Sequence, residues 1–63
     1  MIDQKHKMTS SNPKNIINFI DSAYPKFKGF CYYDENKKCL LSRHEKVDFY
    51  FDPFHGVLHV KEI

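Results

Sequence analysis

A chain of 63 residues, with 41% hydrophobic and 29% charged side chains, has room for one small folded domain and excludes the deep cleft of a large enzyme. Ten basic residues against eight acidic ones give a formal net charge of +2, which is far from the concentrated basic stripe expected of a dedicated duplex-DNA binder and neither demands nor excludes nucleic acid. No run approaches the roughly 18 apolar residues that cross a bilayer, and the N-terminus lacks the apolar centre of a secretion signal. We therefore expect a soluble cytoplasmic protein that does not contact membranes.

Residues 1–11 are polar, and only Met1, Ile2 and Met8 could anchor them to a core. We expect a flexible arm here, with an added edge strand as the alternative. Residues 12–63 should then form a single α+β domain.

The segment that follows carries a helix signal. Asn12 is a suitable N-cap, and Pro13 stands at the first helical position, where its missing N–H has no consequence. Because proline disfavours helical geometry in the residue before it, Pro25 should end the helix near Ala23 or Tyr24. The apolar stripe along this helix consists of Ile16, Phe19, Ile20, Ala23 and Tyr24.

Four short β-rich runs, separated by turn residues, occupy the rest of the chain, with the sequences KGFCYYD, KKCLLS, KVDFYFD and VLHVKEI. The connections are too short for crossover helices, which excludes a parallel sheet. The predicted fold class is α+β, with one N-terminal amphipathic helix packed on a four-stranded antiparallel β-meander.

The final hairpin can be placed in register from its turn. Pro53 suits the start of a type I turn and Gly56 supplies a positive φ, so residues 53–56 form a four-residue loop. Counting outward opposes Asp52 with Val57, Phe51 with Leu58, Tyr50 with His59, Phe49 with Val60, Asp48 with Lys61, and Val47 with Glu62. A slip of one residue would send the apolar face to solvent, which favours this register.

The middle hairpin follows if Ser42 lies opposite Val47. Leu40 then lies opposite Phe49 on the core side, and the apolar face continues across the sheet.

The first hairpin leaves two alternatives open. A three-residue turn at residues 34–36 places Cys31 directly opposite Cys39, close enough to bridge. A two-residue turn places Cys31 opposite Leu40 and reverses the faces of residues 30–33. In either case we expect free thiols, because two cysteines are too few for a disulfide framework and their spacing fits no zinc ribbon.

The four histidines are the first place to look for chemistry. His55 and His59 are four residues apart, but one falls in a turn and the other in a strand, so the helical metal motif does not apply. A nuclease could combine them with Asp48 and Asp52 around a divalent ion. However, Asp48 has a lysine opposite it and Asp52 precedes a turn proline, so structural roles account for both. We expect no catalytic residues, no metal and no cofactor.

The outer face of the meander is the surface most suited to binding, because no second helix covers it. Lys37, Lys38, Arg43 and Lys46 stand at the strand ends. The face itself should show Tyr50, His59, Lys61, Leu41, Val57 and Cys39, with Tyr33 added by one of the two turns. From these sets we predict the binding residues Tyr50, His59, Lys61, Tyr33, Leu41 and Arg43.

Two functions fit this surface. The first is a non-enzymatic protein-interaction module that occupies a protein partner, with a homodimer as one form. The second is a small single-stranded nucleic-acid-binding domain, in which bases stack on Tyr50 among basic residues. A metal-dependent phosphodiesterase ranks third. Nine lysines against one arginine are typical of AT-rich coding, which suits an inhibitor or accessory protein of a phage or mobile element.

Overall fold

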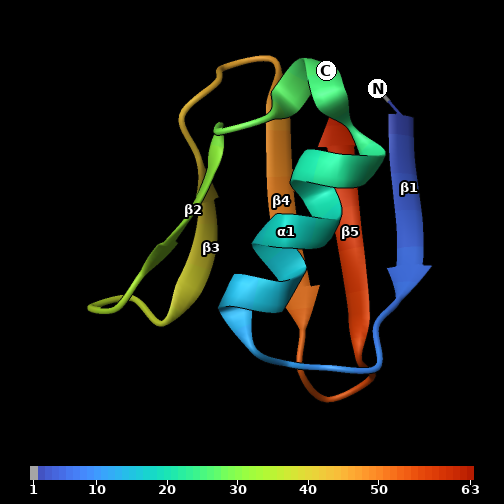
Figure 1. Ribbon diagram of the computed structural model, residues 1–63, viewed down its shortest axis with the longest axis vertical. Coiled ribbons are helices and arrows are strands. Elements are labelled where there is room, and N and C mark those ends of the chain that lie inside the picture. The colour runs from blue at the N-terminus through green and yellow to red at the C-terminus, as the bar shows by residue number, and fades with distance from the viewer. Residues whose placement is uncertain (1) are drawn as a thin grey trace.

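The computed structural model describes residues 2–63 and combines one helix, one three-stranded sheet and one separate hairpin. The elements are β1 (Ile2–Lys7), α1 (Pro13–Ala23), the 3-10 helix η1 (Pro25–Phe27), β2 (Cys31–Asp34), β3 (Cys39–Ser42), β4 (Val47–Asp52) and β5 (Val57–Glu62). The three-stranded sheet has the antiparallel order β1-β5-β4, and β2 pairs with β3. Helix α1 lies across one face of the sheet, and the β2–β3 hairpin stands beside β4 (Figure 1).

The α+β prediction fits this architecture, but three of its details are wrong. The helix is not N-terminal, because β1 precedes it, and residues 2–63 contain five strands instead of four. Those strands form two sheets instead of one meander.

The helix begins and ends as its capping residues predict. Asn12 Oδ1 accepts a hydrogen bond of 2.9 Å from the backbone N–H of Lys14, and Pro13 is the first helical residue. At the other end, the backbone N–H of Tyr24 donates to the carbonyl of Ile20 at 2.8 Å. With 11 residues, α1 is the longest helix among residues 2–63, and no helix there could span a bilayer.

The buried side of α1 is narrower than the predicted stripe. Ile16 and Ile20 are 1% and 0% exposed, and Phe19 is half-buried, whereas Ala23 is exposed. The chain turns into η1 at this point, and Phe27 joins the core from there. The prediction of Ala23 as a core residue is therefore wrong.

The predicted register of the β4–β5 hairpin is confirmed at all six pairs. Gly56 has a φ of 66°, and its N–H donates to the Asp52 carbonyl at 2.8 Å, which closes the four-residue loop. Alternation along the strands then buries one face of the sheet beneath α1. The buried residues of this face are Val47, Phe49, Leu58 and Val60.

Residues 2–7 form an edge strand, which is the alternative considered for the N-terminal segment. The flexible arm expected first is wrong for these residues. β1 pairs with the otherwise open edge of β5, and the N–H of Met8 donates to the Gly56 carbonyl at 2.8 Å. On the helix side of β1, His6 Nε2 lies 2.6 Å from the Tyr24 hydroxyl, which also donates to Gln4 Oε1. Met1 lies outside the described residues.

The ladder expected between β3 and β4 does not form within residues 2–63, although the two strands lie side by side. The polar groups at the start of the connecting loop form hydrogen bonds within the loop and with the Phe30 carbonyl. Ser42 Oγ accepts from the His44 N–H and donates to the His44 carbonyl, both at 3.0 Å. The Arg43 N–H donates to the Phe30 carbonyl at 2.8 Å. These bonds turn the chain before a pairing of Ser42 with Val47 can begin.

Both turns considered for the first hairpin are wrong, because its loop contains four residues, 35–38. Asp34 opposes Cys39, and Cys31 opposes Ser42. Both cysteines are free, as expected, but they do not face each other. Cys31 is 5% exposed, and burial, with a smaller effect from the charge of Asp21, raises the pKa of its thiol to about 12.

Candidate functional site

The face of the sheet opposite α1 carries three of the six predicted binding residues. Tyr50, His59 and Lys61 alternate with the buried positions of β4 and β5, so their side chains leave on the outer side. The pairing of β1 with β5 extends this outer face by Asp3, Lys5 and Lys7, and β4 adds Asp48 and Asp52.

Tyr50 and His59 form the aromatic centre of the outer face. Their ring centroids are 5.7 Å apart, and Tyr50 is 52% exposed. His59 Nδ1 lies 3.6 Å from Asp3 Oδ1 and has no hydrogen-bond partner. The pair therefore presents an accessible phenol, whereas the unpartnered Nδ1 of the imidazole is buried.

The charges of the outer face balance. Three lysines, Lys5, Lys7 and Lys61, share it with three aspartates, Asp3, Asp48 and Asp52. A face of this composition offers no net attraction to a polyanion.

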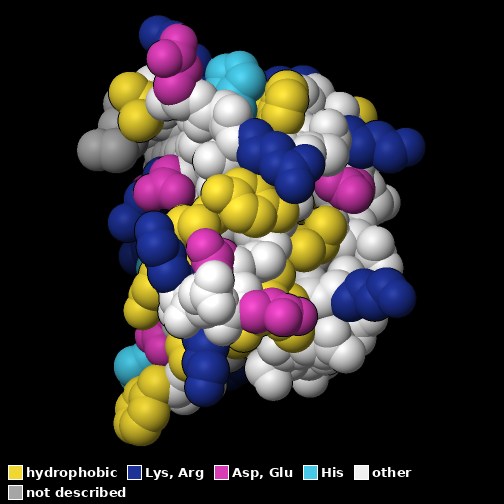
Figure 2. Space-filling view, turned by 90° about the vertical axis from the view of Figure 1, so that its left-hand side faces the viewer, with side chains coloured by type: hydrophobic (Ala, Val, Ile, Leu, Met, Phe, Trp, Pro, Cys, Tyr) yellow, Lys and Arg dark blue, Asp and Glu magenta, His cyan; other side chains and the backbone are white. Residues whose placement is uncertain are grey.

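The other three predicted residues lie on the β2–β3 hairpin and do not join this surface. Leu41 opposes Tyr32 on the outer side of the hairpin, and the Arg43 guanidinium lies 4.8 Å from the Tyr32 ring centroid. Figure 2 shows this side of the molecule, where hydrophobic side chains lie among lysine, arginine and acidic ones. Tyr33 opposes Leu40 on the inner side and packs against the core.

The most exposed large hydrophobic side chain among residues 2–63 is one that the sequence reasoning missed. Phe54, in the β4–β5 loop, is 88% exposed. Its backbone is held, because Asp52 Oδ1 accepts from the N–H groups of Phe54 and His55 at 2.9 and 3.3 Å. The signal was present in the sequence, since an apolar residue inside a four-residue turn has no core to enter.

The loop histidine has a structural partner. His55 Nδ1 lies 2.7 Å from Asp52 Oδ2, and the two rings of Phe54 and His55 meet edge to face with centroids 4.9 Å apart. The hydrogen bond from the His55 side chain is the largest cause of a lowered Asp52 pKa; backbone bonds from His55 and Phe54 add to it and desolvation opposes it. Within residues 2–63, no three His, Cys, Asp or Glu side chains converge as a metal site.

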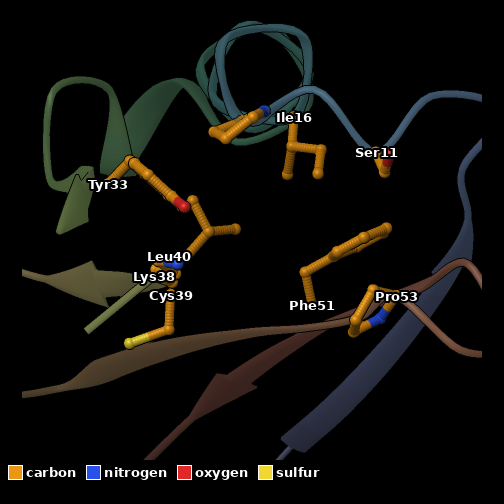
Figure 3. A pocket seen from close by; sticks show the side chains of 9 residues that line it. Ser11, Ile16, Tyr33, Lys38, Cys39, Leu40, Phe51 and Pro53 are labelled. Carbon is orange, nitrogen blue, oxygen red and sulfur yellow. The ribbon is translucent and has the colours of Figure 1, made fainter. Parts of the chain in front are cut away.

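A cavity of about 290 Å³ lies between α1, the β2–β3 hairpin and the end of β4. Figure 3 shows Ile16 reaching in from the helix, Leu40 and the Tyr33 hydroxyl from the hairpin, and Phe51 from β4. The remaining lining residues are Ser11, Pro13, Lys38, Cys39 and Pro53. Sequence reasoning did not predict this cavity, because it lies where the expected ladder between β3 and β4 is missing.

Comparison of the chain with protein-family models, with curated proteins and with solved structures finds no significant match.

Proposed function

We propose that this protein is a small protein-interaction module that docks through its β4–β5 hairpin, with Phe54 as the anchor. The observation that carries the proposal is the exposure of Phe54, 88%, on a loop whose backbone is already ordered. Aromatic anchors dominate the energetics of protein interfaces, and an ordered loop loses little conformational entropy on binding.

The outer face supplies a second contact on the same hairpin. Tyr50 is half exposed, and lysines and aspartates surround it in equal number. Mixed charges around an aromatic centre are typical of the polar rim of an interface between proteins. The partner that fits is a protein with an apolar pocket for Phe54.

The test is a pull-down from an extract of the source cell, followed by measurement of the affinity for the captured protein. Phe54→Ala should weaken binding by about 30-fold or more, as expected of a hot-spot aromatic. Tyr50→Ala should weaken it less. Ile63→Ala removes another exposed hydrophobic side chain, 74% accessible, and serves as the matched control that leaves binding unchanged. Equal capture by wild type and Phe54→Ala would contradict the proposal.

The second candidate is a single-stranded nucleic-acid-binding domain, and Tyr50 is the residue that favours it, since an exposed ring can stack on a base. The three aspartates of the outer face oppose it. The discriminating measurement is fluorescence anisotropy with labelled DNA and RNA oligonucleotides at low salt. This candidate requires binding that falls steeply with added salt and is lost in Tyr50→Ala.

A further inference from the structure

The cavity between α1, the β2–β3 hairpin and β4 has an apolar floor and a polar rim. Ile16 and Leu40, which line its floor, are 1% and 6% exposed. Ser11, Lys38 and Pro53 line it as well and are exposed, so the cavity is open to solvent. A buried apolar floor with a few polar groups at the opening is typical of small-molecule sites.

The size of the cavity limits the ligand. A cavity of about 150 Å³ holds a benzene molecule. The volume here, about 290 Å³, therefore has room for one ring with a short side chain. Ile16, Leu40 and Phe51 supply the contacts for such an apolar body.

The lining of the cavity carries positive charge only. Lys38 is its only charged residue, and Lys38 makes no ion pair within residues 2–63. The other polar side chains, Tyr33 and Ser11, carry hydroxyl groups that can donate hydrogen bonds. Lys38 and Tyr33 approach from the β2–β3 hairpin, whereas Ser11 lies at the other end of the cavity (Figure 3). An anionic group at the hairpin end would meet one cation and one hydroxyl group.

The backbone of Lys38 adopts a conformation that is unfavourable for a lysine. Its φ of 54° makes it the only non-glycine residue with a positive φ among those described. The equivalent loop position in the β4–β5 hairpin is occupied by Gly56, for which this conformation carries no strain. A lysine in place of glycine loses stability here, and it places a charged residue in the lining of the cavity.

We propose that the cavity binds a small arylalkanoate, a carboxylate that carries an aromatic ring on a short chain. The ring packs against Ile16, Leu40 and Phe51, and the carboxylate pairs with the Lys38 ammonium. This site uses other residues than the Phe54 anchor, so the two proposals stand or fall separately.

The experiment is an NMR titration of the isotope-labelled protein with 3-phenylpropionate and with 3-phenylpropan-1-ol, its uncharged counterpart. Methyl signals of Ile16 and Leu40 should shift and saturate below about 10 mM ligand, the range expected of a small fragment. The carboxylate should bind about fivefold more tightly than the alcohol, as expected of one ion pair at a cavity opening.

Two variants locate the charge effect. In Lys38→Gly the fivefold preference for the carboxylate should disappear, while the alcohol binds as before. Lys37→Gly removes the same charge from the neighbouring loop residue, which does not line the cavity, and should keep the preference. Because Lys38→Gly relieves the strain of a positive φ, unfolding would not explain its loss of the preference.

Three results would overturn the proposal. One is equal affinity for the carboxylate and the alcohol in the wild type. Another is loss of the preference in Lys37→Gly as well, which would indicate a general charge effect. The third is a dependence of the Ile16 and Leu40 signals on protein concentration in the absence of ligand, because a second copy of the chain would then fill the cavity.

Discussion

The two hairpin loops of this protein follow one plan and differ at one decisive position. Each has four residues, 35–38 and 53–56, and each begins after an aspartate whose Oδ1 accepts two backbone N–H groups, from the second and third residues beyond it. The fourth loop residue is left-handed in both, but it is Lys38 in one and Gly56 in the other.

That difference separates a loop that serves the fold from one that also presents a side chain. Gly56 satisfies the turn, and its carbonyl accepts from Met8, which ties β1 to the hairpin. Lys38 adopts the same conformation, which lowers the free energy of unfolding, and its amine belongs to the lining of the cavity. The same turn geometry therefore occurs in a loop that is bonded to β1 and in a loop that lines the cavity.

The comparison of the two loops depends on the register observed for the β2–β3 hairpin. The test of this register has the largest expected effect. With a pKa of about 12, the thiolate fraction of Cys31 at pH 8 is smaller than that of a free cysteine by a factor on the order of a thousand. We expect iodoacetamide to label Cys39 first and Cys31 only after denaturation, as checked by peptide mass spectrometry. A disulfide in the purified protein would instead indicate opposed cysteines and a different turn.

The next effect tests the glycine loop. Gly56→Ala should lower the free energy of unfolding by about 1–2 kcal/mol, because alanine is strained at positive φ. The new Cβ would also lie 3.4 Å from the Met8 carbonyl oxygen. Urea denaturation measures the change.

Gly29→Ala is the matched control for that experiment. Gly29 has a φ of 82°, but a Cβ there meets nothing within 4 Å. It should therefore show the strain without the contact and lose less stability than Gly56→Ala. A larger loss at Gly29 would show that the contact of the new Cβ with the Met8 carbonyl oxygen adds nothing at position 56.

The corresponding change in the other loop should have the opposite sign. Lys38→Gly should raise the free energy of unfolding by about 0.5–1 kcal/mol, because glycine adopts positive φ without strain. Lys37→Gly, at the neighbouring position with ordinary φ, should be neutral or destabilising. If both variants shift the urea midpoint in the same direction, the two loops are not equivalent.

The smallest effect is the acid response of the β4–β5 loop. The bond from the His55 side chain, more than any other contact, lowers the Asp52 pKa. A lowered folded pKa stabilises the fold above the unfolded value of about 3.9, and this contribution is lost as the pH falls through the folded value.

Carboxyl NMR titration should therefore place the Asp52 midpoint below about 3.9 in the wild type. In His55→Ala the midpoint should rise towards that value. An unchanged midpoint would show that the His55 side chain is not the main partner of the carboxylate.

The candidate site was partly predictable. Tyr50, His59 and Lys61 share a face because strict alternation and one turn determine it, and both are local properties of the sequence. Tyr33 could not be placed, because the face it occupies depends on the length of a loop without glycine. The exposure of Phe54 was deducible from its turn, whereas the cavity at Lys38 was not.

The sequence by itself determined the ends of α1 and the register of the β4–β5 hairpin, because caps and turns act over a few residues. Only the tertiary structure decided that β1 pairs with β5, that β3 lies beside β4 without a ladder, and that a cavity remains between them. These features depend on contacts between remote segments, and several pairings of short strands satisfy the same alternation of apolar residues. Packing around Ile16, Ile20 and Leu58 selects among them.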